Sequence, residues 1–125
     1  MIRTVFALVV VLTSSALAEP PCQYEDGLKK CKTQCDAGSQ GSCAVLGLIY
    51  VRGDITKKDY ATGEKLLQGA CAAKVAFGCG ALGSMYVMLK DVKRGRPLLE
   101  RACTAGDMLA CESLGSLEAG AASPR

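Results

Sequence analysis

The cysteines are the residues of this sequence with the greatest capacity for chemistry. The 125-residue chain contains eight cysteines and has neither histidine nor tryptophan. Thiols can hold a metal ion, catalyse thiol–disulfide exchange or form structural disulfides, and their spacing separates these alternatives. Zinc sites often combine closely spaced cysteines with histidine, and thioredoxin-like chemistry needs Cys-x2-Cys. The closest approach here is Cys31-x3-Cys35. The spacing therefore favours structural disulfides over a metal or redox site.

Three cysteine pairs share one spacing, Cys-x7-Cys. They enclose the stretches "CDAGSQGSC", "CAAKVAFGC" and "CTAGDMLAC", whose ends repeat while their interiors change. A ligand-binding loop would repeat its contents, whereas a disulfide has to repeat only its ends. Closing so short a loop stabilises a chain by roughly 2.5 kcal/mol in the chain-entropy estimate. The predicted bridges are Cys35–Cys43, Cys71–Cys79 and Cys103–Cys111.

Cys22 and Cys31 form the remaining pair. One continuous helix would place them about 13 Å apart along its axis, whereas a disulfide tolerates a Cα separation of about 7 Å at most. We therefore predict that Cys22 folds back near Gly27, before the helix begins, and bridges Cys31. The alternative is a mixed or intermolecular disulfide through Cys22.

The cysteine pairs belong to a longer internal repeat. A Leu-Gly pair follows each Cys-x7-Cys at the same distance, and "KDYATGEKLLQGAC" aligns with "KDVKRGRPLLERAC". A period in the mid-thirties with paired amphipathic segments predicts an all-α fold, an α-solenoid of helix–turn–helix repeats. Glycine inside a helix costs about 1 kcal/mol relative to alanine. Its recurrence at Gly47, Gly83 and Gly115 therefore predicts that another helix crosses closely at each position.

The cysteines must lie where consecutive helices meet. Apolar residues recur at helical spacing, and each first cysteine then ends one helix while its partner begins the next. We expect the fifth helix to begin late, near Pro97, because proline is favoured at the first helical position. The predicted helices lie near 25–36, 42–52, 59–71, 78–89, 97–105 and 109–118.

The N-terminus predicts export. A positive start is followed by the apolar run Val5–Leu12, which is too short to span a bilayer, and by the small residues of Ala16-Leu17-Ala18. We expect a signal peptide at 1–18, a repeat domain of about two and a half units at 19–118 and a flexible tail at 119–125. A membrane anchor is the alternative. Export and an even cysteine count predict a secreted or periplasmic protein with no membrane anchor after cleavage.

Catalytic constellations are scarce. Without histidine there is no Ser-His-Asp or Cys-His arrangement, and Ser-x-x-Lys, Ser-Asp-Asn and Lys-Thr-Gly are also missing. The neighbours Glu25-Asp26 and Glu64-Lys65 are expected to be solvated helix faces. The net charge of +3 is too small to predict nucleic acid or an acidic membrane as partner. We expect no enzymatic activity, no cofactor and no metal.

A family resemblance follows from these repeats. Leu-Gly-x-x-Tyr, then Lys-Asp-Tyr, Leu-Leu and Ala-Cys resemble the Sel-one-like repeat family, and Cys-x7-Cys resembles its secreted bacterial cysteine-rich branch. The resemblance covers essentially all of 19–125. It implies a right-handed superhelix with one bridge per unit, acting as an interaction scaffold in the periplasm or outside the cell. Some members of that branch are described as penicillin-binding proteins or weak β-lactamases, so the resemblance implies β-lactam binding or hydrolysis as the alternative function.

Comparison of the units suggests a partner surface. Ala44, Val45, Leu48 and Arg52 change to Gly80, Ala81, Ser84 and Met88, and this variable set falls on one helical face. Solenoids usually bind partners on the variable face of their stacked helices; the alternative is that these positions vary because nothing touches them. We expect a monomer that binds another protein or peptide, with a chaperone or assembly factor for another exported protein as a further option. The candidate binding residues are Leu48, Arg52, Ser84 and Met88.

Overall fold

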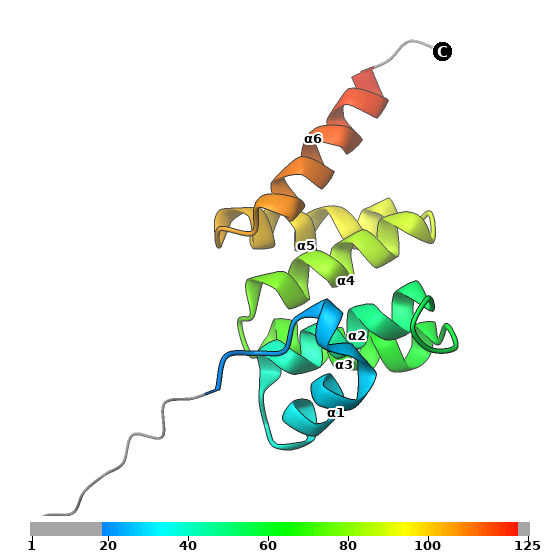
Figure 1. The fold of residues 1–125 in the computed structure, drawn as a ribbon. Coiled ribbons are helices and arrows are strands. Elements are labelled where there is room, and N and C mark those ends of the chain that lie inside the picture. The colour runs from blue at the N-terminus through cyan, green and yellow to red at the C-terminus, as the bar shows by residue number, and fades with distance from the viewer. Residues whose placement is uncertain (1–18, 123–125) are drawn as a thin grey trace, which may run out of the picture.

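The computed structural model describes residues 19–122; the predicted signal peptide and positions 123–125 of the predicted tail lie outside the described residues. The fold is all-α, as predicted, with six helices in sequence (Figure 1). A short 3-10 turn, η1, precedes them. The elements are η1 (Tyr24–Asp26), α1 (Gly27–Asp36), α2 (Gln40–Arg52), α3 (Tyr60–Ala72), α4 (Ala76–Met88), α5 (Val92–Thr104) and α6 (Met108–Ala122).

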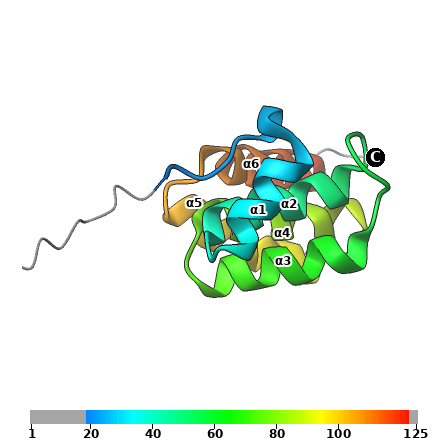
Figure 2. The same cartoon turned by 60° about the horizontal axis from the view of Figure 1, so that its bottom comes forward.

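Consecutive helices pack against each other as antiparallel pairs (Figures 1 and 2). α2 also packs against α4, and α4 against α6, whereas within residues 19–122 no Cα atom of α3 comes within 8 Å of a Cα atom of α1 or α5. The helices α2, α4 and α6 therefore form the more tightly stacked side of the solenoid, here called the inner layer. The helices α1, α3 and α5 form the outer layer.

Side-chain caps set the starts of several helices. Asp59 accepts a hydrogen bond from Thr62 N at 3.0 Å, and Asp91 accepts one from Arg94 N at 3.2 Å. The expectation that the fifth helix begins near Pro97 is wrong, because Asp91 caps the helix at Val92 and leaves Pro97 inside it. Proline removes one backbone donor and crowds the preceding turn, but the cap and the packing of Leu99 outweigh that cost. α6 extends to Ala122, beyond the predicted end at 118.

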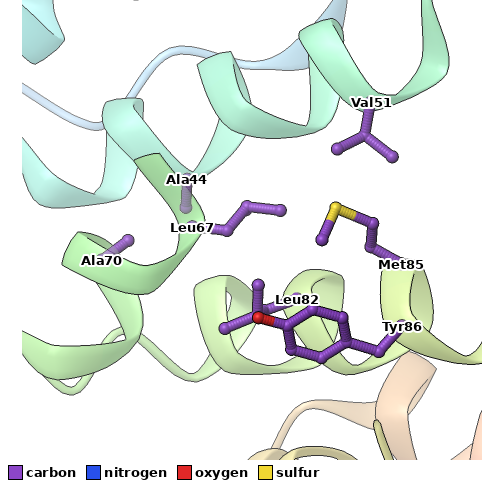
Figure 3. Packing of buried hydrophobic residues seen from close by; sticks show 7 residues of the cluster. All are labelled: Ala44, Val51, Leu67, Ala70, Leu82, Met85 and Tyr86. Atoms are coloured by element: carbon purple, nitrogen blue, oxygen red, sulfur yellow. The ribbon is translucent and has the colours of Figure 1, made fainter. Parts of the chain in front are cut away.

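The core is small and runs through all the units. Its central cluster joins α2, α3 and α4 through Ala44, Val51, Leu67, Ala70, Leu82, Met85 and Tyr86 (Figure 3). Two flanking clusters contain disulfides: Cys22 and Cys31 pack with Ile49, and Cys71 and Cys79 pack with Leu99. The bridges therefore contribute buried apolar surface as well as cross-links.

Paired glycines let the two helices of a unit cross closely. A Cβ on Gly47 would lie 3.1 Å from the carbonyl oxygen of Gly63, and a Cβ on Gly63 would lie 2.9 Å from that of Gly47. Gly83 and Gly95 repeat this arrangement at 2.9 and 2.7 Å. The predicted crossing is thus confirmed at Gly47 and Gly83. The prediction is wrong at Gly115, where a Cβ would meet no atom within 4 Å, because no described helix follows α6.

All eight cysteines are in disulfides, and the pairs are those that the spacing predicted. The Cα–Cα distances are 4.6 Å for Cys35–Cys43, 4.5 Å for Cys71–Cys79 and 4.7 Å for Cys103–Cys111. Each of these bridges joins the end of one helix to the start of the next. The fourth bridge, Cys22–Cys31, has a Cα–Cα distance of 5.3 Å. It forms because the chain reverses through η1 and Gly27, whose φ is +83°.

Four disulfides indicate an oxidising, extracytoplasmic compartment. None of the helices within residues 19–122 combines the length and the apolar character needed to cross a membrane.

Candidate binding surface

Two hollows border the inner layer. The N-terminal hollow, of about 450 Å³, lies between the segment 21–25, α2 and the start of α4. The C-terminal hollow, of about 300 Å³, lies between α4 and α6 above Leu99 of α5. The structure places Leu48 and Arg52 in the lining of the first, and Ser84 and Met88 in the lining of the second. The four predicted residues thus divide between two hollows in consecutive units.

Ala44 does not belong to this surface, although it varies together with Leu48 and Arg52 in the sequence. Its side chain is fully buried, and it packs in the central cluster against α3 and α4 (Figure 3). A small residue at this position therefore reflects the close approach of neighbouring helices and says nothing about a partner. Val45, one residue further along α2, does line the N-terminal hollow.

Disulfides fix both walls of the N-terminal hollow. On one side Cys22 is bridged to Cys31, and its backbone N donates to Ser42 Oγ at 3.1 Å. The buried Ser42 hydroxyl in turn donates to Gln34 Oε1 at 2.6 Å. On the other side Phe77 follows the turn that the Cys71–Cys79 bridge closes. The hollow therefore exists before any ligand arrives, which limits the entropy lost on binding.

The lining of the N-terminal hollow is largely apolar, with one charged end. The half-buried side chains of Val45, Leu48, Val75 and Phe77 contribute apolar surface. At the other end the Arg52 guanidinium lies 4.7 Å from the centre of the Tyr24 ring. Such a combination of apolar walls and a few oriented polar groups is typical of sites that bind small molecules or single side chains.

Arg52 belongs to a cluster with Tyr24 and Asp54. Its guanidinium lies 3.4 Å from Asp54 Oδ2, and Tyr24 Oη donates to Asp54 Oδ1. That hydrogen bond from Tyr24 lowers the pKa of the Asp54 carboxyl. Partial burial, followed by the bond to Asp54, raises the pKa of the Tyr24 hydroxyl. Arg52 is therefore oriented by its neighbours, while its side chain is still 54% exposed.

The next unit contains a matching cluster of Tyr86, Glu64 and Arg94. Tyr86 Oη donates to Glu64 Oε1 at 2.7 Å, and the Arg94 guanidinium lies 4.1 Å from the centre of the Tyr86 ring. Burial, then the bond to Glu64, raises the pKa of the Tyr86 hydroxyl. The sequence predicts Glu64 on a solvated helix face, but the side chain is half-buried. The contact joins three helices, so no local sequence pattern reveals it.

The C-terminal hollow has an apolar floor and a hydroxyl rim. Leu99 is fully buried beneath it, while Met88 is 57% exposed at its edge. Ser113 Oγ and Ser116 Oγ donate to carbonyl oxygens of their own helix at 2.9 and 3.0 Å. Their oxygens remain able to accept hydrogen bonds from a ligand.

The hydroxyl and charged groups of the two hollows can hold a ligand through hydrogen bonds and ion pairs. The cysteines are all bridged, and no group of three or more metal-ligating side chains gathers within residues 19–122. The ionisable side chains in the N-terminal hollow are Tyr24, Glu25 and Arg52.

Comparison of the chain with protein-family models, curated proteins and solved structures finds no match in any of the three.

Proposed function

We propose that this chain is an exported Sel-one-like repeat scaffold, periplasmic or secreted, that binds a peptide segment of another protein along its inner layer. The observation that carries this proposal is the placement of Leu48, Arg52, Ser84 and Met88. They occupy two repeat positions at which the first and second units differ, and they line hollows on one side of the solenoid. Repeat proteins commonly use a stacked helix layer in this way.

The physical form of the hollows supports a peptide as ligand. Each hollow is open and mostly apolar, and its volume suits one or two side chains. Because α2 and α4 belong to consecutive units and stack directly, a segment lying across them can place one side chain in each hollow. The oxidised walls of the N-terminal hollow reduce the ordering cost that usually weakens peptide binding.

Substitutions that introduce a glutamate test this proposal. We expect Leu48→Glu to weaken binding of peptides selected on the wild-type protein at least tenfold, because it places a charge on the apolar wall. Lys65→Glu on the exposed side of α3 is the matched control. Isothermal titration calorimetry on oxidised protein gives both affinities. Equal affinities for the wild type and both variants would overturn the proposal.

The β-lactam role that the family resemblance implies is tested on the same preparation. Turnover of a chromogenic cephalosporin by pure oxidised protein, lost on reduction and unfolding, would replace the scaffold by an enzyme. No turnover, together with peptide binding that depends on Leu48, is the result that we expect.

A further inference from the structure

In each of two units a turn connects the first helix to the second, and both turns lie on one edge of the solenoid. These are the α2–α3 turn, residues 53–59, and the α4–α5 turn, residues 89–91. They lie on the same side of the molecule (Figure 1). The contacts of Glu64 at the start of α3 with Tyr86 near the end of α4 and Arg94 in the first turn of α5 place them together. We call this side the loop edge; it comprises Ile55, Lys57, Lys58, Leu89, Lys90, Val92 and Lys93.

Three apolar side chains project from the loop edge. Ile55 is 44% exposed, Leu89 47% and Val92 38%. Exposed apolar residues scattered singly need no explanation, but a group on one edge indicates an interaction surface. The α4–α5 turn is held by hydrogen bonds from Lys90 N to Val87 O at 3.0 Å and from Asp91 N to Tyr86 O at 2.8 Å. Leu89 and Val92 are therefore presented by ordered backbone.

The loop edge also exposes positive charges that no acidic side chain in the described part of the chain neutralises. Within residues 19–122, Lys57, Lys58, Lys90 and Lys93 form no ion pair within 4.0 Å. The Lys58 ammonium lies 5.6 Å from the centre of the Tyr60 ring.

The acidic residues of the loop edge, by contrast, have partners within the fold. Asp54 binds Tyr24 and Arg52. Asp59 caps α3, while Asp91 caps α5 and binds Arg94. The lysines are thus free to contact an external anion while the carboxylates are occupied.

We propose that the loop edge binds an anionic lipid surface, with Ile55, Leu89 and Val92 entering the interface and the four lysines contacting lipid phosphates. The apolar residues stand on projecting turns among lysines, whereas the hollows that suit a peptide lie along the inner layer. Protruding apolar groups combined with basic ones bind anionic membranes through hydrophobic burial and electrostatic attraction. This inference is independent of the peptide-binding role. Binding through the loop edge would orient the solenoid with its disulfide-closed turns away from the membrane.

The lysine contribution is measured by flotation of the oxidised full chain with phosphatidylcholine vesicles that contain or lack phosphatidylglycerol. We expect binding only to the anionic vesicles, weakened by added salt. Each lysine near an anionic surface raises the partition coefficient about fivefold. The double variant Lys90→Gln/Lys93→Gln should therefore lower the partition coefficient about 25-fold.

The opposite edge supplies a matched control. Lys74 and Arg101 lie together beside the α3–α4 turn, so Lys74→Gln/Arg101→Gln removes the same charge away from the loop edge. We expect this control to bind like the wild type. A second variant, Leu89→Ser, removes apolar surface at constant charge and should also weaken binding. Circular dichroism checks that all variants fold.

Four outcomes would overturn the proposal. They are the absence of wild-type binding to anionic vesicles, an equal loss in the control pair, unchanged binding of Leu89→Ser, and binding to immobilised polyglutamate without binding to vesicles. The last outcome would assign the loop edge to an acidic protein.

Discussion

At the residue scale, the surroundings of the repeated glycines show which helix faces are covered by another helix. Gly47 and Gly83 sit where a partner backbone leaves no room for a Cβ, and each meets a second glycine on the crossing helix. Gly115 occupies the same place in the repeat but faces open space. The same residue type therefore has a packing role in two units and none in the third. Gly115 therefore serves as an internal control for substitutions of Gly47 and Gly83, the glycines at which two helices cross.

The glycine substitutions have opposite predicted effects. We expect Gly83→Ala to destabilise the fold by about 1–3 kcal/mol, because the Gly95 carbonyl oxygen would lie 2.9 Å from the new Cβ. Gly115→Ala should stabilise it by up to about 1 kcal/mol, because an exposed helical glycine is replaced without a clash. Urea denaturation measures both. Destabilisation by Gly115→Ala would show that the open face of α6 is covered.

The acidic caps predict how stability depends on pH. Hydrogen bonds from Thr62 lower the pKa of Asp59, and hydrogen bonds from Arg94 lower the pKa of Asp91. A carboxyl whose pKa is lower in the folded state stabilises the protein above its unfolded pKa of about 4, and this contribution is lost as the pH falls through the folded pKa. Stability should therefore fall as the pH drops below about 4.

Asparagine keeps the capping hydrogen bond without titrating. In Asp59→Asn/Asp91→Asn the decline in melting temperature below pH 4 should be shallower than in the wild type. Thermal melts across pH 2–7 provide the comparison. Parallel curves for wild type and variant would show that these two caps do not contribute to the acid sensitivity.

At the element scale, three of the four disulfides link one helix to the next, so the effect of losing one of them depends on its place in the stack. Cys71 and Cys79 are buried between α3 and α4 in the middle of the chain, whereas Cys103 and Cys111 attach α6, which has no described helix after it. Loss of either bridge removes a constraint worth about 2–3 kcal/mol. Loss of the first weakens the whole solenoid, whereas loss of the second affects its end.

Hydrogen exchange distinguishes these two cases. In Cys103→Ser/Cys111→Ser we expect faster exchange confined to α6. In Cys71→Ser/Cys79→Ser we expect faster exchange in α3, α4 and the helices that they contact. Uniform acceleration in both variants would show that the helices unfold as a single unit and that the stack has no separable end.

At the scale of the whole molecule, the sequence predicts the architecture better than the surface. The cysteine spacing and the repeat predict the helices and the disulfides, because both depend on local periodicity and on lengths that recur. The start of α5 is missed because the Asp91 cap overrides the preference of Pro97 for a first turn. The Tyr86–Glu64–Arg94 cluster is missed because three helices contribute to it.

The candidate site is predictable only in part, because contacts between several helices shape it. Variation between units identifies Leu48, Arg52, Ser84 and Met88, but their division between two hollows depends on how α2, α4 and α6 stack. The wall formed by the segment 21–25 depends on the fold-back through Gly27. Neither arrangement follows from helical periodicity alone.

The central claim is that a protein partner lies along the inner layer, and site-specific photo-crosslinking in the exported protein tests it most directly. A benzoylphenylalanine replaces Leu48 or Met88 on the inner layer, or Lys65 on the outer layer as the control. We predict that the same partner band is captured from positions 48 and 88 and not from position 65. Capture from position 65 alone, or equal capture from all three positions, would contradict the account.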